Sequence, residues 1–190
     1  MEAPVIRFTV ETPLPSGRMR VAATAQGVIW AAFHETDTEQ MPEGLDITDT
    51  STDRRATLVT SRLSAYFTGK WRNPSFNLPI DWSLTSNLQR KVLRCLHDTV
   101  PFGETVTYGA LAERSAAFDP DVARSGQAAR LVGTIMATTP VAILIPAHRV
   151  IAADGLGGFG TTPDALPTKR WLLTLEGCIP PTLDWDGPEV

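Results

Sequence analysis

The chain has 190 residues, of which 43% are hydrophobic and 20% charged, a composition that is typical of folded globular proteins and argues against disorder. It has no run of eighteen apolar residues, and Met1–Val10 has no basic segment followed by an apolar one, so we expect a cytoplasmic protein without a membrane span or secretory signal. A net charge of −4 argues against a nonspecific nucleic-acid coat, but residues 85–177 carry nine Lys and Arg against eight Asp and Glu and are the only stretch that is not net acidic.

The first part of the chain predicts a small antiparallel sheet. Residues 18–34 read as two strands around a Gln26-Gly27 turn, and Val5–Val10 fits a third strand. The polar stretch Glu35–Asp53 is expected to be an exposed connection.

A helix is predicted next, over Arg54–Lys70, with a stop at Gly69. Its apolar residues recur at helical spacing and would pack across the sheet; they are Leu58, Val59, Leu63, Tyr66 and Phe67. Trp71–Trp82 contains two prolines and is expected to be a linker with a short strand at Phe76–Ile80. Residues 1–82 are therefore predicted to form an α+β domain with its linker.

From residue 83 onward the pattern becomes helical. Ser86 or Asn87 can cap a helix that stops before Pro101, and its inward residues would be Leu88, Val92 and Leu96. We expect this helix to begin a second domain over residues 83–178, followed by a tail over 179–190.

Two further short helices predict a helix-turn-helix. The first is Tyr108–Glu113, capped by Thr107, and the second is Gly126–Met136. The polar loop Ser115–Ser125 between them is longer than the compact motif uses. Val141–Ile145 is then a short apolar run.

The final predicted helix, Thr168–Glu176, ends at Gly177. Its inward residues would be Trp171, Leu172 and Leu175.

Several motifs follow one another in a set order. The segment Ile143-Leu-Ile-Pro-Ala-His-Arg-Val-Ile151 precedes the glycine-rich Gly155-Leu-Gly-Gly-Phe-Gly160 and then Lys169-Arg-Trp-Leu-Leu-Thr-Leu-Glu-Gly177. Upstream lie Gln89, the run 101–112 and Ala128-Ala-Arg-Leu-Val-Gly133. From about Tyr66 to Gly177 the chain resembles the O6-alkylguanine-DNA alkyltransferase family, whose signature is Pro-Cys-His-Arg-Val. The resemblance implies a ribonuclease-H-like N-terminal domain and a winged helix-turn-helix C-terminal domain.

The resemblance also implies a catalytic site at three positions. In the family a cysteine thiolate attacks the alkyl carbon of a flipped guanine, a histidine takes the thiol proton through water, and a glutamate orients the histidine. The matching residues here are Ala147, His148 and Glu176. A thiol is mostly protonated at neutral pH and needs a base, and the base and its orienting residue remain. A methyl group has no lone pair, so covalent transfer to position 147 is excluded.

Recognition residues are implied in the same way. Arg130 would fill the space left by the flipped base, and Tyr108 would press on the rotated phosphate and hydrogen-bond the base. The backbone of Ala147, Val150 and Gly160 would read the guanine edge, with Phe159 in the pocket wall. The remaining implied DNA contacts are Ala129, Gly133 and Arg149. Alanine at position 147 would enlarge the pocket, so we expect that it can also hold larger O6-adducts.

Some residues depart from the family pattern. Thr139 stands where asparagine is usual, Phe159 stands where tyrosine is usual, and Thr161-Thr162 replaces part of the glycine-rich turn. Asp119 and Asp121 lie in the inserted loop, near the expected DNA face. Of these changes, Thr139 and Phe159 favour a natural loss of the cysteine.

The sequence therefore predicts a monomeric DNA-repair protein that binds double-stranded DNA through the minor groove, holds an extruded O6-alkylguanine and flags it for another pathway, with nucleotide excision repair proteins as candidate partners. No cofactor, metal or membrane partner is implied. Three alternatives stay open: an active alkyltransferase with an engineered alanine, a hydrolase that uses water held by His148 and Glu176, and a regulatory DNA-binding homologue.

Other interpretations of the same residues are structural. His148 could be a hydrogen-bonded core histidine, Arg130 a solvated charge and Tyr108 a packing residue. The glycine spacing of 155–160 also fits a dinucleotide loop, but no βαβ unit surrounds it, so we reject a nicotinamide cofactor. The two cysteines, Cys95 and Cys178, are expected to be reduced and inert, without a metal.

Overall fold

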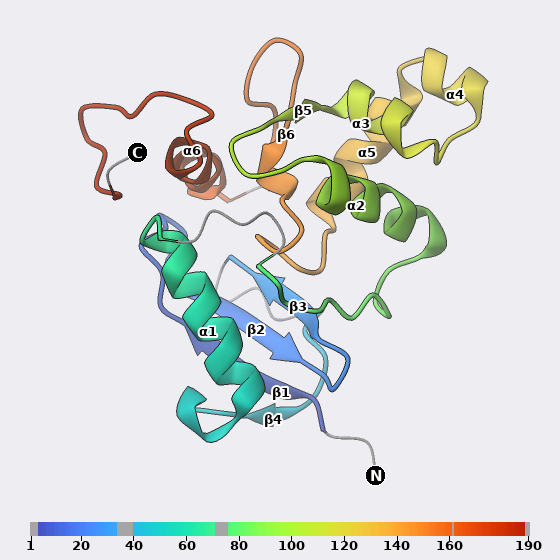
Figure 1. The fold of residues 1–190 in the computed structure, drawn as a ribbon. Helices are drawn as coiled ribbons and strands as arrows, with labels where there is room; N and C mark the ends of the chain where they lie inside the picture. The colour runs from blue at the N-terminus through green and yellow to red at the C-terminus, as the bar shows by residue number, and fades with distance from the viewer. Residues whose placement is uncertain (1–3, 34–39, 71–75, 161, 189–190) are drawn as a thin grey trace.

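The computed structural model describes residues 4–33, 40–70, 76–160 and 162–188. Figure 1 shows a small sheet with one helix across it, and a cluster of helices beyond the sheet. The α+β class is confirmed, while the ribonuclease-H-like and winged descriptions stay predictions. Within the part of the chain that the structure describes, no helix has the length and apolarity to cross a membrane.

The sheet has the strand order β3-β2-β1-β4. Three predicted strands are present and antiparallel, namely β1 (Ile6–Val10), β2 (Met19–Ala23) and β3 (Val28–Ala32). The fourth, β4 (Leu45–Asp46), pairs parallel with β1 and falls in the stretch predicted as a connection. The sheet is therefore mixed. The strand β4 was not predicted because two exposed residues carry no alternating pattern by which a strand could be recognised.

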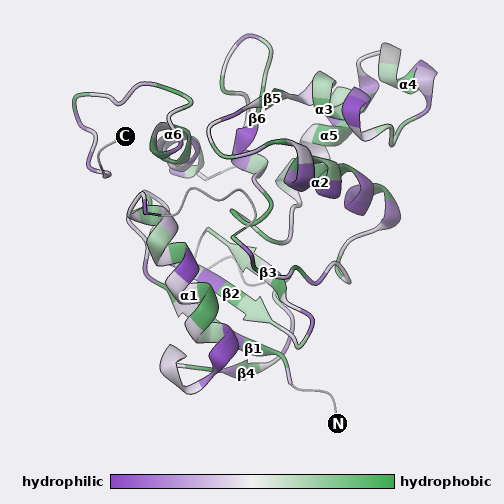
Figure 2. Cartoon of the chain, viewed as in Figure 1, coloured by the Kyte–Doolittle hydropathy of each residue, from purple (hydrophilic) through white to green (hydrophobic). Residues whose placement is uncertain are grey.

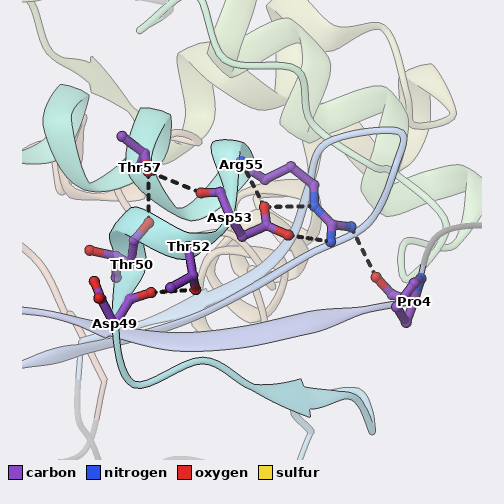
Figure 3. Close-up of polar contacts among 7 residues, drawn as sticks. All are labelled: Pro4, Asp49, Thr50, Thr52, Asp53, Arg55 and Thr57. Carbon is purple, nitrogen blue, oxygen red and sulfur yellow. Dashed lines mark hydrogen bonds and ion pairs between the residues drawn. The ribbon is translucent and has the colours of Figure 1, made fainter.

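Helix α1 (Arg54–Phe67) is capped by a small polar network, which Figure 3 shows. The Asp53 carboxylate accepts a hydrogen bond from the Arg55 backbone N–H at 2.8 Å and from its guanidinium at 3.1 and 2.8 Å. The same guanidinium donates to the Pro4 carbonyl at 2.9 Å, and the Thr57 hydroxyl donates to the Thr50 carbonyl at 2.7 Å. Because Pro4 precedes β1, this cap ties the start of the helix to the sheet.

The buried face of α1 is narrower than its apolar pattern suggests. Val59, Leu63, Tyr66 and Phe67 are buried, as predicted, but Leu58 is 43% exposed. Figure 2 shows hydrophobic and hydrophilic residues alternating along this helix, as expected for one buried stripe.

Helix α2 (Asn87–Thr99) begins with a capping box. The Gln89 backbone N–H donates to the Ser86 hydroxyl at 3.3 Å, and the Gln89 side chain accepts from the Ser86 backbone N–H at 3.1 Å. Val92 and Leu96 are buried as predicted, but Leu88 is 40% exposed. It lies in the first turn, beyond the edge of the core.

The predicted helix pair is present as α3 (Tyr108–Ser115) and α5 (Gln127–Ala137). The connection between them contains a short helix, α4 (Pro120–Arg124), where a loop was predicted. Asp119 caps α4 by accepting from the Asp121 backbone N–H at 2.9 Å. A two-residue parallel pair, β5 (Val106–Thr107) and β6 (Val150–Ile151), was also not predicted.

The apolar run Val141–Ile145 joins the two parts of the molecule. The Ala31 backbone N–H in β3 donates to the Pro140 carbonyl at 2.8 Å, and the Ala142 backbone N–H donates back to Ala31 at 2.9 Å. The strand predicted at Phe76–Ile80 is wrong, since only a single bridge forms there, between Val28 and Ile80. One continuous core includes residues from the sheet and the helices, and the boundary after residue 82 stays a prediction.

Helix α6 (Ala165–Leu175) starts three residues earlier than predicted, because Pro167 is tolerated in its first turn. Its predicted inward residues Trp171, Leu172 and Leu175 are buried. The tail packs back on it: Trp185 contacts Trp171 at 5.2 Å between ring centroids, and the Trp171 indole N–H donates to Asp186 at 3.0 Å.

Candidate functional site

Ala147 lies at the centre of the candidate site. It begins one turn of 3-10 helix, Ala147–Arg149, between the apolar run and β6, and it is 8% exposed. Two cavities have Ala147 in their walls. The position that resembles the family's nucleophile is thus reachable from both cavities.

The larger cavity, about 540 Å³, contains most of the predicted recognition residues. Its wall includes Tyr108, Ala129, Arg130, Gly133, Ala147, Phe159 and Gly160. The smaller cavity, about 290 Å³, lies against β3 and shares Ala147, Phe159 and Gly160 with the first. Val150 lines neither, and its carbonyl already accepts a hydrogen bond from the Lys169 ammonium at 2.7 Å.

Tyr108 and Arg130 reach the larger cavity from different helices. The Thr107 hydroxyl accepts from the Ala110 backbone N–H at 3.2 Å and so sets Tyr108 in the first turn of α3. The Tyr108 hydroxyl donates to the Gly158 carbonyl at 3.1 Å. Arg130 is exposed on α5 and forms no ion pair with any residue that the structure describes.

Gly157 makes close contact possible between the glycine-rich loop and Tyr108. It has φ +70°, and a Cβ there would lie 3.0 Å from the Tyr108 ring and 3.1 Å from the Ala152 nitrogen. Any other residue would be strained and would push the loop away from the ring.

His148 and Glu176 form the predicted pair. The imidazole Nε2 lies 2.9 Å from the Glu176 Oε1, and both side chains are fully buried. Burial raises the pKa of Glu176, but His148 and Arg149 outweigh it and lower that pKa to about 2. Burial lowers the pKa of His148, so its neutral form donates from Nε2. The Nδ1 atom then carries a lone pair, and it has no hydrogen-bond partner among the described residues.

Arg149 does not occupy the predicted DNA-contacting position. It is 1% exposed, and its guanidinium donates to Glu176 at 2.7 and 2.9 Å and to the Val100 carbonyl at 2.8 Å. A cation held this way compensates the buried carboxylate and cannot reach a phosphate.

Two buried residues make polar contacts that the sequence analysis did not predict. Tyr66, from α1, donates its hydroxyl to the Glu176 Oε1 at 2.7 Å. Burial is the main cause that raises the pKa of Tyr66, so the hydroxyl stays protonated. Lys169 is fully buried on α6, and burial lowers its pKa to about 8. Neither residue stands in a sequence pattern that signals a polar partner.

The pair also predicts a dependence of stability on pH. His148 has a lowered pKa in the folded state, so the unfolded chain binds more protons as the pH falls below about 6.5. Glu176 has a folded pKa of about 2 against an ordinary 4.5, so its contribution is complete above pH 4.5 and is lost as the pH falls toward 2. Urea unfolding at pH 8, 6, 5 and 3.5 should give a free energy that falls at each step below 6.5. A flat profile from 6.5 to 3.5 would contradict both shifts.

Among the described residues, neither a metal-binding cluster nor a cysteine lies at the site. Within the described ranges, no group of three or more His, Cys, Asp or Glu residues could hold a metal ion. Neither cysteine lines a described cavity, and burial raises the pKa of Cys178 to about 11. Cys178 is therefore a thiol at neutral pH, as predicted for an inert cysteine.

Comparisons with known proteins decide the family. Residues 87–178 match the family described as 6-O-methylguanine DNA methyltransferase, DNA binding domain. A DNA base-flipping protein of Thermus thermophilus is 37% identical over 123 residues, which cover 64% of this chain and 73% of that protein. The chain belongs to the 6-O-methylguanine DNA methyltransferase family.

Other members of the methyltransferase family match over different lengths. A methylated-DNA–protein-cysteine methyltransferase of Mycolicibacterium paratuberculosis is 40% identical over 116 residues, 60% of this chain and 61% of that protein. The matched segment thus spans less than two thirds of this methyltransferase. In three dimensions the likeness is longer: Mycobacterium tuberculosis OGT in complex with DNA has 28% identity and a TM-score of 0.68, covering 90% of this chain and 92% of that one.

Proposed function

We propose that the protein binds duplex DNA, holds an extruded O6-alkylguanine in the cavity beside Ala147, and does not accept the alkyl group. One observation carries this proposal: Ala147 lines both cavities, next to a buried His148–Glu176 pair that is complete apart from its nucleophile. The site has the parts needed to receive a flipped base. It lacks the atom that would form a bond to the alkyl carbon.

The chemistry of the site supports binding without transfer. A methyl side chain offers no electron pair, and Cys95 and Cys178 lie outside both cavity walls. His148 Nδ1 could accept a proton from water, but water is a poor nucleophile toward an unactivated methyl group. The lesion should therefore leave the complex unchanged.

The DNA-binding part of the proposal depends on α3 and α5. Arg130 is exposed at the cavity rim, where a guanidinium can stack and hydrogen-bond in the space left by an extruded base. The similar M. tuberculosis protein was solved in complex with DNA, which supports DNA binding. The β5–β6 pair beside α3 is the candidate wing of a winged helix-turn-helix. Binding should weaken as salt rises, in proportion to the number of phosphates that Lys and Arg side chains contact.

A protein that binds a lesion without removing it has to act through another pathway. We infer that the complex marks O6-alkylguanine for nucleotide excision repair proteins, and that the protein acts as a monomer on cytoplasmic DNA. The relative from T. thermophilus is described as a DNA base-flipping protein, which supports base flipping as a role within this family.

Gel shifts with matched duplexes test this function. The protein should bind a duplex with one O6-methylguanine at least about tenfold more tightly than the guanine duplex, because flipping is cheapest for a poorly paired base and the pocket adds contacts. Arg130→Ala should reduce the affinity for the lesion duplex by about tenfold or more. Arg18→Ala is the matched control, since Arg18 pairs with Glu11 at 2.9 Å on the sheet side and should leave both affinities unchanged. Equal affinity of the native protein for the two duplexes would replace the lesion-reader proposal with a regulatory one.

A further inference from the structure

Lys169 is a buried ammonium that the proposed function leaves without a role. Its side chain is fully buried on α6, and no carboxylate lies in ion-pair contact with it among the described residues. Its Nζ instead donates to the Val150 carbonyl at 2.7 Å and the Gly158 carbonyl at 3.2 Å, and it lies 5.6 Å from the centroid of the Phe159 ring. A buried charge with only neutral partners is costly and needs an explanation.

These contacts join both ends of the segment that forms one side of the larger cavity. Val150 lies in β6 before the glycine-rich loop, and Gly158 and Phe159 lie in the cavity wall. Lys169 thus joins the start and the end of this segment by hydrogen bonds. It does not line either cavity, so a bound ligand would not need to displace it.

The Gly158 carbonyl accepts a second hydrogen bond, from a residue that lines the cavity. The Tyr108 hydroxyl also donates to this oxygen, at 3.1 Å, but from the cavity side and from a residue that is only half-buried. If Tyr108 exchanges its bond to Gly158 for a bond to an incoming base, only Lys169 still holds the carbonyl. The buried ammonium can therefore keep the wall in place while the tyrosine moves.

We propose that Lys169 is a positioning residue for lesion recognition, which fixes the segment 150–159 as one wall of the base pocket through the Val150 and Gly158 carbonyls. The inference rests on the proposed lesion binding and adds a residue that determines specificity. Such a residue affects how tightly the extruded base is bound and leaves the contacts to the DNA backbone unchanged.

Lys169→Met tests this, because methionine has a similar length and packs well in a core but donates no hydrogen bond. The variant should bind the guanine duplex as the native protein does and lose about tenfold in its preference for the O6-methylguanine duplex. Lys91→Met is the control for a lost charge. Lys91 lies on α2, its ammonium donates to the Ala116 carbonyl at 2.6 Å, and it lines neither cavity. It should keep the full preference.

The outcomes separate the two proposals. No preference in the native protein would refute lesion binding itself, whereas a native preference that Lys169→Met retains would overturn only the role of Lys169. If Lys169→Met does not fold, NMR of the ammonium groups in the native protein decides, with the signal assigned through Lys169→Arg. The Lys169 signal should shift with the O6-methylguanine duplex and not with the guanine duplex. Equal shifts would overturn the proposal.

Discussion

Ala147→Cys is expected to turn the protein into a single-use methyl acceptor. The new thiol would stand next to His148, whose Nδ1 is free to accept its proton, and whose Nε2 is held by Glu176 at 2.9 Å. A sulfur–carbon bond would form, the bond between O6 and the methyl carbon would break, and guanine would leave with a proton. Intact-protein mass spectrometry after incubation with O6-methylguanine duplex should show a gain of one methyl group per molecule.

The unmodified protein is the control for this experiment, because it keeps Cys95 and Cys178. It should show no mass gain, since neither cysteine lines a cavity and Cys178 has a raised pKa of about 11. A methylated native protein would remove the proposal of binding without transfer. A cysteine variant that binds the lesion but stays unmodified would show that the geometry around position 147 no longer supports the family's reaction.

Glu176→Gln should be the most destabilising of the conservative substitutions in the site. The carboxylate accepts from Tyr66, His148 and Arg149, so each of its hydrogen-bond partners among the described residues is a donor. The amide NH₂ of glutamine would face a donor, and the Arg149 guanidinium would be left buried without a counter-charge. Removing one partner of a buried ion pair typically costs about 3–5 kcal/mol, so the urea midpoint should fall sharply.

A surface pair gives the matched comparison. Glu11→Gln removes the partner of Arg18, where both side chains are more than half exposed, and exposed pairs contribute at most about 1 kcal/mol. Arg149→Met combined with Glu176→Leu should recover much of the loss, because it removes both charges together. Equal effects of Glu176→Gln and Glu11→Gln would contradict the account of the buried network.

The sequence predicted the regular elements well where a local pattern carried them. Strand alternation and the caps at Ser86 and Thr107 act over a few residues, so a single sequence is enough to predict them. The strand β4 and the helix α4 were missed because each is only 2 to 5 residues long and depends on contacts elsewhere.

The errors in the site have a different origin. Arg149 was assigned to DNA from the family resemblance, and its partner Glu176 lies 27 residues away in the sequence. Tyr66 lies 110 residues from the same carboxylate. Only the three-dimensional fold brings these three side chains together, and no spacing rule relates them.

One oxygen atom of Glu176, Oε1, connects three parts of the folded chain. It accepts hydrogen bonds from Tyr66 on α1, from His148 and from Arg149, which lie in different parts of the chain. If α1 separated from the rest, the carboxylate would lose the Tyr66 donor while the His148 imidazole and the Arg149 guanidinium beside it stayed buried. The docking of α1 and the burial of the His148–Glu176 pair therefore stabilise each other through this shared atom.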